Sequence, residues 1–319
     1  MEESQLTEAC DQTPVQALTG EKSPGFWPER LAWLPIPCFC LAIGLLAYLR
    51  LQEAWNPPLL IPVLNILFLT FIPFLVSTVA GRSFLTGQSA SVLFLGCGTL
   101  SLALASALAS LLIGGQMINR GVTIYNTGAC LAGACHLISG LWTTCADGGP
   151  PRYGRSLLAW LYLAVMASIA ALAVAAYQNL LPTFFVEGRG ATLWNQLVLL
   201  TAATLFTISA VLLSASRNEA NRAFRRWYAL GLGLIAAGLV GVSVQVRLGD
   251  PLNWVGRTAQ YLGGLYMLIA VIISVRRSGT WMLPLEQALR ESEDRYQSLV
   301  NLSPDAILVH ADDFLIFAN

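Results

Sequence analysis

The sequence has few charged residues. Asp, Glu, Lys and Arg make up 11% of its 319 residues, whereas an ordinary soluble domain contains about 25%. The 18 basic and 18 acidic residues cancel to a formal charge of zero. No basic surface therefore indicates a nucleic-acid partner, and no acidic tract indicates a solvating tail. This scarcity of charge excludes a normal water-soluble globule.

Hydrophobic residues dominate instead. They account for 55% of the chain, and the mean hydropathy is +0.62. A membrane-spanning helix needs about 20 apolar residues. Several stretches of about this length contain no acidic residue and predict an all-α bundle of about eight transmembrane helices in the lipid bilayer. The eight stretches are residues 31–51, 59–79, 90–113, 122–142, 157–177, 197–214, 227–246 and 258–275.

Basic residues are divided unevenly between the two sides of this predicted bundle. With both termini in the cytoplasm, the inner segments hold most of them, concentrated at residues 217–226 and 276–277. The positive-inside rule then predicts a multi-pass protein of the inner (plasma) membrane with cytoplasmic termini. The polar residues 1–30 are expected to form a disordered cytoplasmic tail. The outer loops are expected to hold Arg50, Arg120, Arg189, Arg247 and Arg257.

His136 is the only histidine in the predicted spans. At 100° per residue, Tyr125 and His136 fall on one helix face together with Ala129 and Gly140. An ionisable group in a membrane is a functional-site hypothesis, here as proton acceptor, metal ligand or partner of a quinone-like or haem-like molecule. The alternative is a neutral imidazole that bonds to a neighbouring helix.

Two asparagines in the spans are further candidates. Asn126 lies on another face of the same helix as His136, and Asn65 lies in the second span. For both, the alternative to a sensing role is hydrogen bonding between helices. The candidate sensing residues are therefore His136, Tyr125, Asn126 and Asn65.

The cysteines of the predicted spans are weak candidates for a soft metal such as copper(I). Their spacing does not place several ligands on one helix face, and membrane cysteines commonly act as small apolar filler. We therefore predict no metal site. The five residues are Cys38, Cys40, Cys97, Cys130 and Cys135.

Two other patterns concern helix packing. Small residues are dense at 90–113 and 157–177, which predicts close approach of these helices to their neighbours. Pro73 lies within the second span and predicts a kink there. Together these patterns indicate a compact bundle.

After residue 277 the pattern changes to that of a soluble signalling helix. Leu285, Leu289, Tyr296 and Leu299 follow a heptad seam, with paired charges outside it. Residues 278–295 are therefore predicted to form a coiled-coil linker that pairs two subunits, which makes the protein a homodimer. The alternative is a lone amphipathic helix packed on its own domain.

The last residues predict a hairpin, with strands at 306–310 and 314–319. This region resembles the opening of a PAS domain through Arg295-Tyr296, Ser303-Pro304-Asp305-Ala306 and Asn319, although Asp312-Asp313 replaces the usual glycine turn and Leu302 takes a position that is more often polar. The resemblance implies that residues 296–319 form the N-terminal part of a PAS domain. A hairpin alone buries too little apolar surface to be stable, so we expect a longer protein.

Residues 31–277, the predicted membrane domain, also resemble a known family. The resemblance rests on residues 122–128 with His136, on residues 181–186 with Gly190 and Thr192, and on residues 254–264. These features are similar to membrane-associated sensor regions of the MASE type, which precede PAS domains in prokaryotic sensor histidine kinases and cyclic-dinucleotide enzymes. The resemblance does not identify a ligand or a cofactor.

The sequence therefore predicts a membrane sensor module of a signal-transduction protein, most simply a PAS-containing histidine kinase of a two-component system. A membrane-soluble small ligand or a quinone is a possible signal. No catalytic domain is predicted within these residues. The alternative is a transporter or channel with a regulatory C-terminus, against which the spans show no acid and no mid-membrane Arg or Lys to couple ions. An intramembrane enzyme is disfavoured because the spans hold one histidine and no acid.

Overall fold

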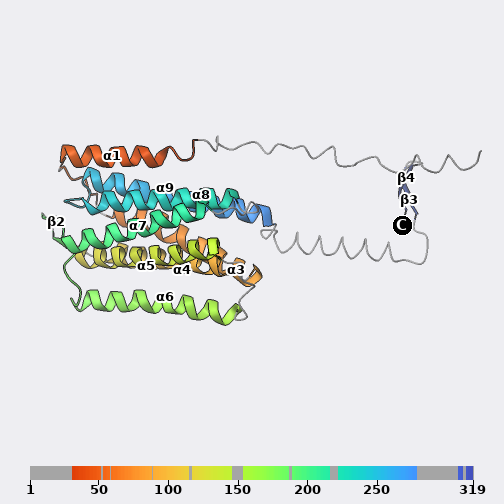
Figure 1. The fold of residues 1–319 in the computed structure, drawn as a ribbon, viewed down its shortest axis with the longest axis horizontal. Helices are drawn as coiled ribbons and strands as arrows, with labels where there is room; N and C mark the ends of the chain where they lie inside the picture. Colours follow the sequence, from red (N-terminus) through yellow and green to blue (C-terminus); the bar gives the residue numbers. More distant parts are fainter. Residues whose placement is uncertain are drawn as a thin grey trace, which may run out of the picture.

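The computed structural model describes residues 31–51, 53–57, 59–87, 89–114, 117–145, 154–186, 189–215, 222–278, 308–311 and 314–318. Within them, eight helical rods pack side by side (Figure 1). Each rod overlaps one of the eight predicted stretches. The rods are α1 (Pro35–Leu49), the continuous α2 (Leu60–Asn65), η2 (Ile66–Phe71) and α3 (Ile72–Gly87), α4 (Ala90–Gly114), α5 (Ile118–Cys145), α6 (Gly154–Tyr177), α7 (Leu193–Ala215), α8 (Arg222–Ser243) and α9 (Pro251–Ser278).

Six of these rods are long and apolar enough to cross a membrane, so the chain is a membrane protein. The exceptions are α1 and α5. With 15 residues, α1 is about 22 Å long, against about 30 Å for the hydrocarbon core. By contrast, α5 has 28 residues but carries several polar side chains. Because α5 packs between α4 and α7, most of its polar groups face protein.

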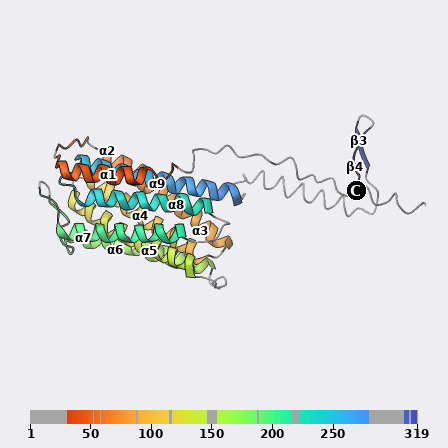
Figure 2. The same ribbon diagram turned by 45° about the horizontal axis from the view of Figure 1, so that its top comes forward.

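The order of the helices places two of them at the edges of the bundle. Neighbours in contact are α3 with α4, α4 with α5, α5 with α7, α7 with α8, and α8 with α9. At one edge α1 packs on α8 and α9, and at the other α6 packs on α4 and α5 (Figures 1 and 2). Most of the small residues of α6 point outward, since only Val165, Ile169 and Ala176 are buried. The prediction of close packing is therefore correct for α4 and wrong for α6.

Successive rods run in opposite directions, so the bundle has two distinct ends. At the loop end (residues 50–59, 178–192 and 244–250), β1 (Phe185–Val186) pairs with β2 (Gly190–Ala191). There the backbone N–H groups of Phe184 and Phe185 donate to Asn119 Oδ1 at 3.0 and 2.9 Å. The opposite end, called the arginine end, holds the start of α1, the end of α9 and the residues Arg82, Arg222, Arg225, Arg226 and Arg276.

A clasp at the loop end joins the start of α9 to the segment before α2. The backbone N–H of Trp55 donates to the carbonyl of Gly249 at 2.9 Å, and Trp254 Nε1 donates to the carbonyl of Trp55 at 2.8 Å. The two indole rings lie 5.6 Å apart. Gly249 has φ +83°, and a Cβ there would lie 2.6 Å from the Trp55 carbonyl oxygen. Only glycine fits this position without displacing the clasp.

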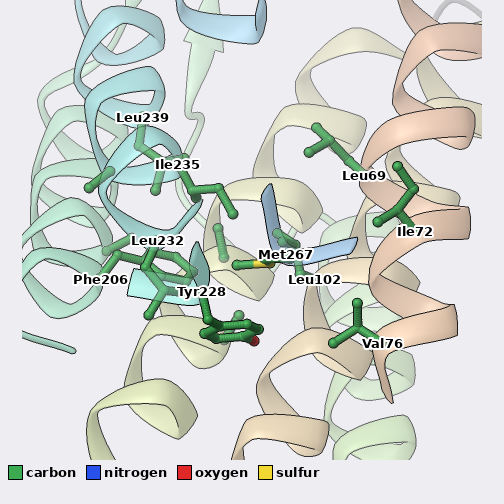
Figure 3. Close-up of a cluster of buried hydrophobic side chains, with 14 of the residues drawn as sticks. Leu69, Ile72, Val76, Leu102, Phe206, Tyr228, Leu232, Ile235, Leu239 and Met267 are labelled. Atoms are coloured by element: carbon green, nitrogen blue, oxygen red, sulfur yellow. The ribbon is translucent and has the colours of Figure 1, made fainter. Parts of the chain in front are cut away.

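The apolar core lies between the α3 and α8 sides of the bundle (Figure 3). Leu69, Ile72 and Val76 face Tyr228 and Leu232 across Met267, which is fully buried. Just before Pro73, where the sequence predicts a kink, the helix contains the π-helical turn η2, which ends immediately before α3. A π turn accommodates a proline because its wider ring relieves the clash of the pyrrolidine with the preceding carbonyl groups.

The hairpin predicted near the C-terminus is confirmed. Strand β3 (Leu308–Ala311) pairs antiparallel with β4 (Phe314–Ala318), with an irregularity between Val309 and His310. The predicted tail 1–30 and the predicted linker lie outside the described residues. The same holds for Leu285, Leu289, Tyr296 and Leu299, and for the residues that carry most of the PAS resemblance.

Candidate functional site

Arg257 is buried inside the bundle. It lies on α9, its side chain is 2% exposed, and its Nε and Nη1 atoms have no hydrogen-bond partner among the described residues. Its placement in an outer loop, predicted from the sequence, is therefore wrong. One buried arginine therefore lies within the apolar helix Pro251–Arg276, near its loop end.

Arg257 lies in a helix rather than in a loop because α9 starts earlier than the sequence predicted. The helix begins at Pro251, seven residues before the predicted span, because Asp250 caps it. Asp250 Oδ1 accepts from the Asn253 N–H at 2.6 Å, and Oδ2 accepts from the N–H groups of Val246 and Arg247 at 2.8 and 3.2 Å. An Asp cap followed by Pro at the first helical position is a helix-start signal visible in the sequence.

Tyr125 and Gln260 complete the environment of Arg257. The guanidinium carbon of Arg257 lies 4.6 Å from the centre of the Tyr125 ring, a cation–π contact. The Tyr125 hydroxyl donates to Gln260 Oε1 at 2.6 Å. Gln260 is fully buried, and its Nε2 has no partner among the described residues. We call Tyr125, Arg257 and Gln260 the donor cluster.

Asparagine pairs join other helices near the donor cluster. Tyr261, which follows Gln260, donates to Asn65 Oδ1 at 2.8 Å and stacks on Phe68. Asn126 Nδ2, one residue after Tyr125, donates to Asn195 Oδ1. These bonds tie α2 to α9 and α5 to α7. Both predicted asparagines thus have the geometry of interhelical hydrogen bonding, the alternative given for them above.

The unmatched polar atoms around the donor cluster are mostly donors. Among the described residues, the donors are Arg257 Nε and Nη1, Gln260 Nε2, Gln245 Nε2 and Asn195 Nδ2, and the one acceptor is Asn253 Oδ1, one turn before Arg257 on α9. A buried donor left unpaired costs about 1–3 kcal/mol. The arrangement is chemically matched to acceptor oxygens, such as those of water, a carbonyl group or a carboxylate. These nitrogens can hold such an acceptor, and the Tyr125 ring keeps the cation in place.

His136 lies in a separate contact. Its Nδ1 donates to the Ala132 carbonyl at 2.7 Å, and its Nε2 accepts from the Tyr228 hydroxyl at 2.9 Å. The imidazole is 1% exposed, stacks on Tyr228 and lies at a tilt against the Phe206 ring. Both ring nitrogens are therefore engaged in a link between α5 and α8. This is the geometry of the alternative given above, and a sensing role for His136 remains a prediction.

The predicted sensing residues form two groups rather than one. Tyr125, Asn126 and Asn65 lie in the half of the bundle near the loop end, whereas His136 is three turns further along α5. At 1.5 Å per residue the separation of Tyr125 and His136 along the helix is about 16 Å. Sequence reasoning found Tyr125 but missed its partners Arg257 and Gln260, which come from a helix 135 residues away in sequence.

The cysteines are distributed around the bundle. Cys97 and Cys135 pack in one small apolar cluster, Cys130 is half-buried, and Cys38 and Cys40 are exposed on α1. All five are free thiols. Among the residues that the structure describes, no group of three or more His, Cys, Asp or Glu side chains is placed to hold a metal ion.

Comparison with protein families gives a match over more than half of the chain. Residues 57–277 match the model of MASE3, described as a membrane-associated sensor domain. The matched region runs from just before α2 to the end of α9 and includes the donor cluster, the asparagine pairs and His136. Neither a curated protein nor a solved structure matches the chain.

Proposed function

Because the chain belongs to the MASE3 family of membrane-associated sensor domains, we propose that its bundle senses a membrane-borne signal through the donor cluster and passes it along α9 to a cytoplasmic PAS and output domain. The output is of the histidine-kinase type, as the PAS resemblance of the C-terminal residues suggests. The β3–β4 hairpin supports the PAS part of this proposal.

One observation carries the proposal. The buried cation and its unmatched donors are on α9, the same helix that ends at Ser278 and leads into the predicted linker. Any ligand that binds Arg257 or Gln260 therefore acts directly on the helix that connects to the output. A contact on α6, at the edge of the bundle, has no such route.

The signal we propose is a membrane-soluble molecule that presents acceptor oxygens, such as a quinone. Its carbonyl groups would accept from Arg257 and Gln260, whose N–H groups are unmatched. Binding transmits a signal only if the ligand favours one arrangement of the bundle over another by a few kcal/mol. The Tyr125–Gln260 bond joins α5 to α9 and can differ between two such arrangements.

The proposed orientation places the arginine end in the cytoplasm. Arg82, Arg222, Arg226 and Arg276 are at that end, together with the start of α1 and the end of α9. An excess of arginine on one side is typical of the cytoplasmic face. In this orientation α9 enters the cytoplasm where the predicted linker to the PAS domain begins.

Disulfide cross-linking tests the proposal in native membranes. Leu285→Cys in the predicted seam reports the relation of the two linker helices in a homodimer, with the parent chain as background. We expect decylubiquinone to change the cross-linking yield at residue 285 and Arg257→Gln to abolish that change. The matched control is Arg120→Gln, since Arg120 is at the loop end and stacks on Tyr177 outside the donor cluster.

Two results would contradict this function. Arg257→Gln could leave the quinone-dependent change intact, which would remove the donor cluster from the signalling route. Alternatively, the linker could fail to cross-link at any seam position, which would argue against the paired linker.

A further inference from the structure

A second candidate binding site lies at the arginine end, away from the donor cluster. A groove of about 1210 Å³ is enclosed by α1, α7 and α8. The wall residues Cys40, Val211 and Ser214 are exposed, so the groove opens to the outside of the bundle. In a membrane protein this outside is the bilayer.

Charge is confined to one end of the groove. Arg222, Arg225 and Arg226 line it in the first two turns of α8. The remaining lining residues are uncharged and mostly apolar. Along the floor, on α8, they are Ala229, Leu230, Gly233, Ala236, Ala237 and Val240.

The floor of the groove is long enough to span one leaflet of a bilayer. From Arg226 to Val240 the helix rises about 21 Å at 1.5 Å per residue. A hydrocarbon core about 30 Å thick gives each leaflet about 15 Å. An amphiphile with its head at the arginines would therefore have its whole chain beside the floor of the groove.

The electrostatics of the arginine end favour an anion. Arg222, Arg225 and Arg226 bring three guanidinium groups together at this end of the groove. Guanidinium groups bind phosphate through paired N–H donors. A phosphate at this position would offset the mutual repulsion of the arginines.

Most residues of the floor are small. A Cβ on Gly233 would lie 3.1 Å from Ile36 Cδ1 of α1, so α1 approaches α8 closely at this point. Val211 and Ser214 of α7 form the opposite wall. The small floor leaves room for an acyl chain between two helices that flank α8.

We propose that this groove is a binding site for an anionic membrane lipid, whose phosphate lies among Arg222, Arg225 and Arg226 and whose acyl chain lies along α8. The proposal is independent of the donor cluster. It also gives α1 a role, because α1 supplies one wall and precedes the region that matches the sensor family.

Native mass spectrometry of the full chain in detergent tests this site. We expect the chain to retain phosphatidylglycerol at least about fivefold more tightly than phosphatidylcholine. The double variant R222Q/R226Q should lose this preference; both side chains are exposed, so the bundle should still fold. Val240→Phe, at the far end of the floor, should weaken retention of both lipids, since it occupies the space of the acyl chain.

The control is Arg82→Gln, which removes a positive charge at the same end but outside the groove. It should keep the lipid preference. Equal retention of the two lipids by the parent chain would overturn the proposal, as would equal loss in Arg82→Gln and R222Q/R226Q. Displacement of phosphatidylglycerol by millimolar inorganic phosphate alone would show a simple anion site and would also overturn it.

Discussion

The guanidinium carbon of Arg257 lies 4.6 Å above the ring of Tyr125, in the interior of a bundle built for lipid. Two of its nitrogens have no hydrogen-bond partner among the described residues. A buried cation held mainly by an aromatic face is expensive to keep. We infer that Arg257 lowers the free energy of unfolding of the bundle and is kept for ligand binding. The first prediction measures this loss of stability.

Arg257→Met should leave the bundle at least as stable as the parent chain. Methionine keeps much of the side-chain volume and removes the charge, and such replacements are neutral or stabilising by about 1–4 kcal/mol. Denaturant unfolding in detergent, followed by circular dichroism, measures the change. A loss of more than about 1 kcal/mol would show that the guanidinium is well paired in the folded protein.

Tyr125→Phe should destabilise the bundle by about 1–3 kcal/mol, because Gln260 then loses the hydroxyl that donates to its Oε1. Adding Gln260→Leu should recover part of that loss, since no buried amide is then left unpaired. Unfolding of both single variants and the double variant gives the coupling energy. Strictly additive effects would rule out the Tyr125–Gln260 bond.

His136→Leu should also cost about 1–3 kcal/mol, because it removes the partner of the Tyr228 hydroxyl. The compensating change is Tyr228→Phe, which removes that hydroxyl. If the His136 link is purely structural, the double variant recovers stability and the cross-linking response at residue 285 is unchanged. A lost response in a fully restored double variant would assign His136 a sensing role.

Gly263→Ala should separate α8 from α9. A Cβ at this position would lie 2.8 Å from the Gly231 carbonyl oxygen, so one of the two helices must move. We expect a loss of about 1–3 kcal/mol, as for other overpacked sites. The control is Gly44→Ala, where nothing lies within 4 Å of the new Cβ. That change should be neutral or slightly stabilising through helix propensity.

Asp250→Ala should destabilise the start of α9 by about 1–2 kcal/mol, since three backbone N–H groups lose their acceptor. Asp250→Asn keeps one acceptor oxygen and should cost less. Hydrogen exchange at the first turn of α9 is the direct measurement. Unchanged protection in Asp250→Ala would mean that the helix start does not depend on the cap.

Hydropathy alone was enough to predict the eight helical rods, because a long apolar run has few alternatives to a helix in a membrane. The start of α9 was predicted seven residues late. The predicted span began after Arg257 because a charged residue was taken as the boundary of a membrane helix. Asp250-Pro251 marked the true start of α9. A local capping signal should therefore take precedence over a local charge when a span is bounded.

The partners of the buried polar residues could not be predicted from the sequence. Helical periodicity places Tyr125 and His136 on one buried face, and the structure confirms the burial. Periodicity alone cannot show that Tyr125 contacts α9 and His136 contacts α8, because those contacts depend on the order in which the helices pack. The outward direction of the alanines of α6 has the same origin, since small residues suit a tight interface without requiring one.

The tryptophan clasp holds the loop end of α9, so a tilt of the helix displaces mainly its opposite end. Trp55, Trp254 and Gly249 fix its loop end, and the donor cluster lies only two turns from that fixed point. With 28 residues, α9 is about 42 Å long. A tilt of about 5° about the clasp would move Ser278 by about 4 Å at that length. A displacement near Arg257 too small to disturb the surrounding side chains would thus be enlarged several-fold at the end of α9.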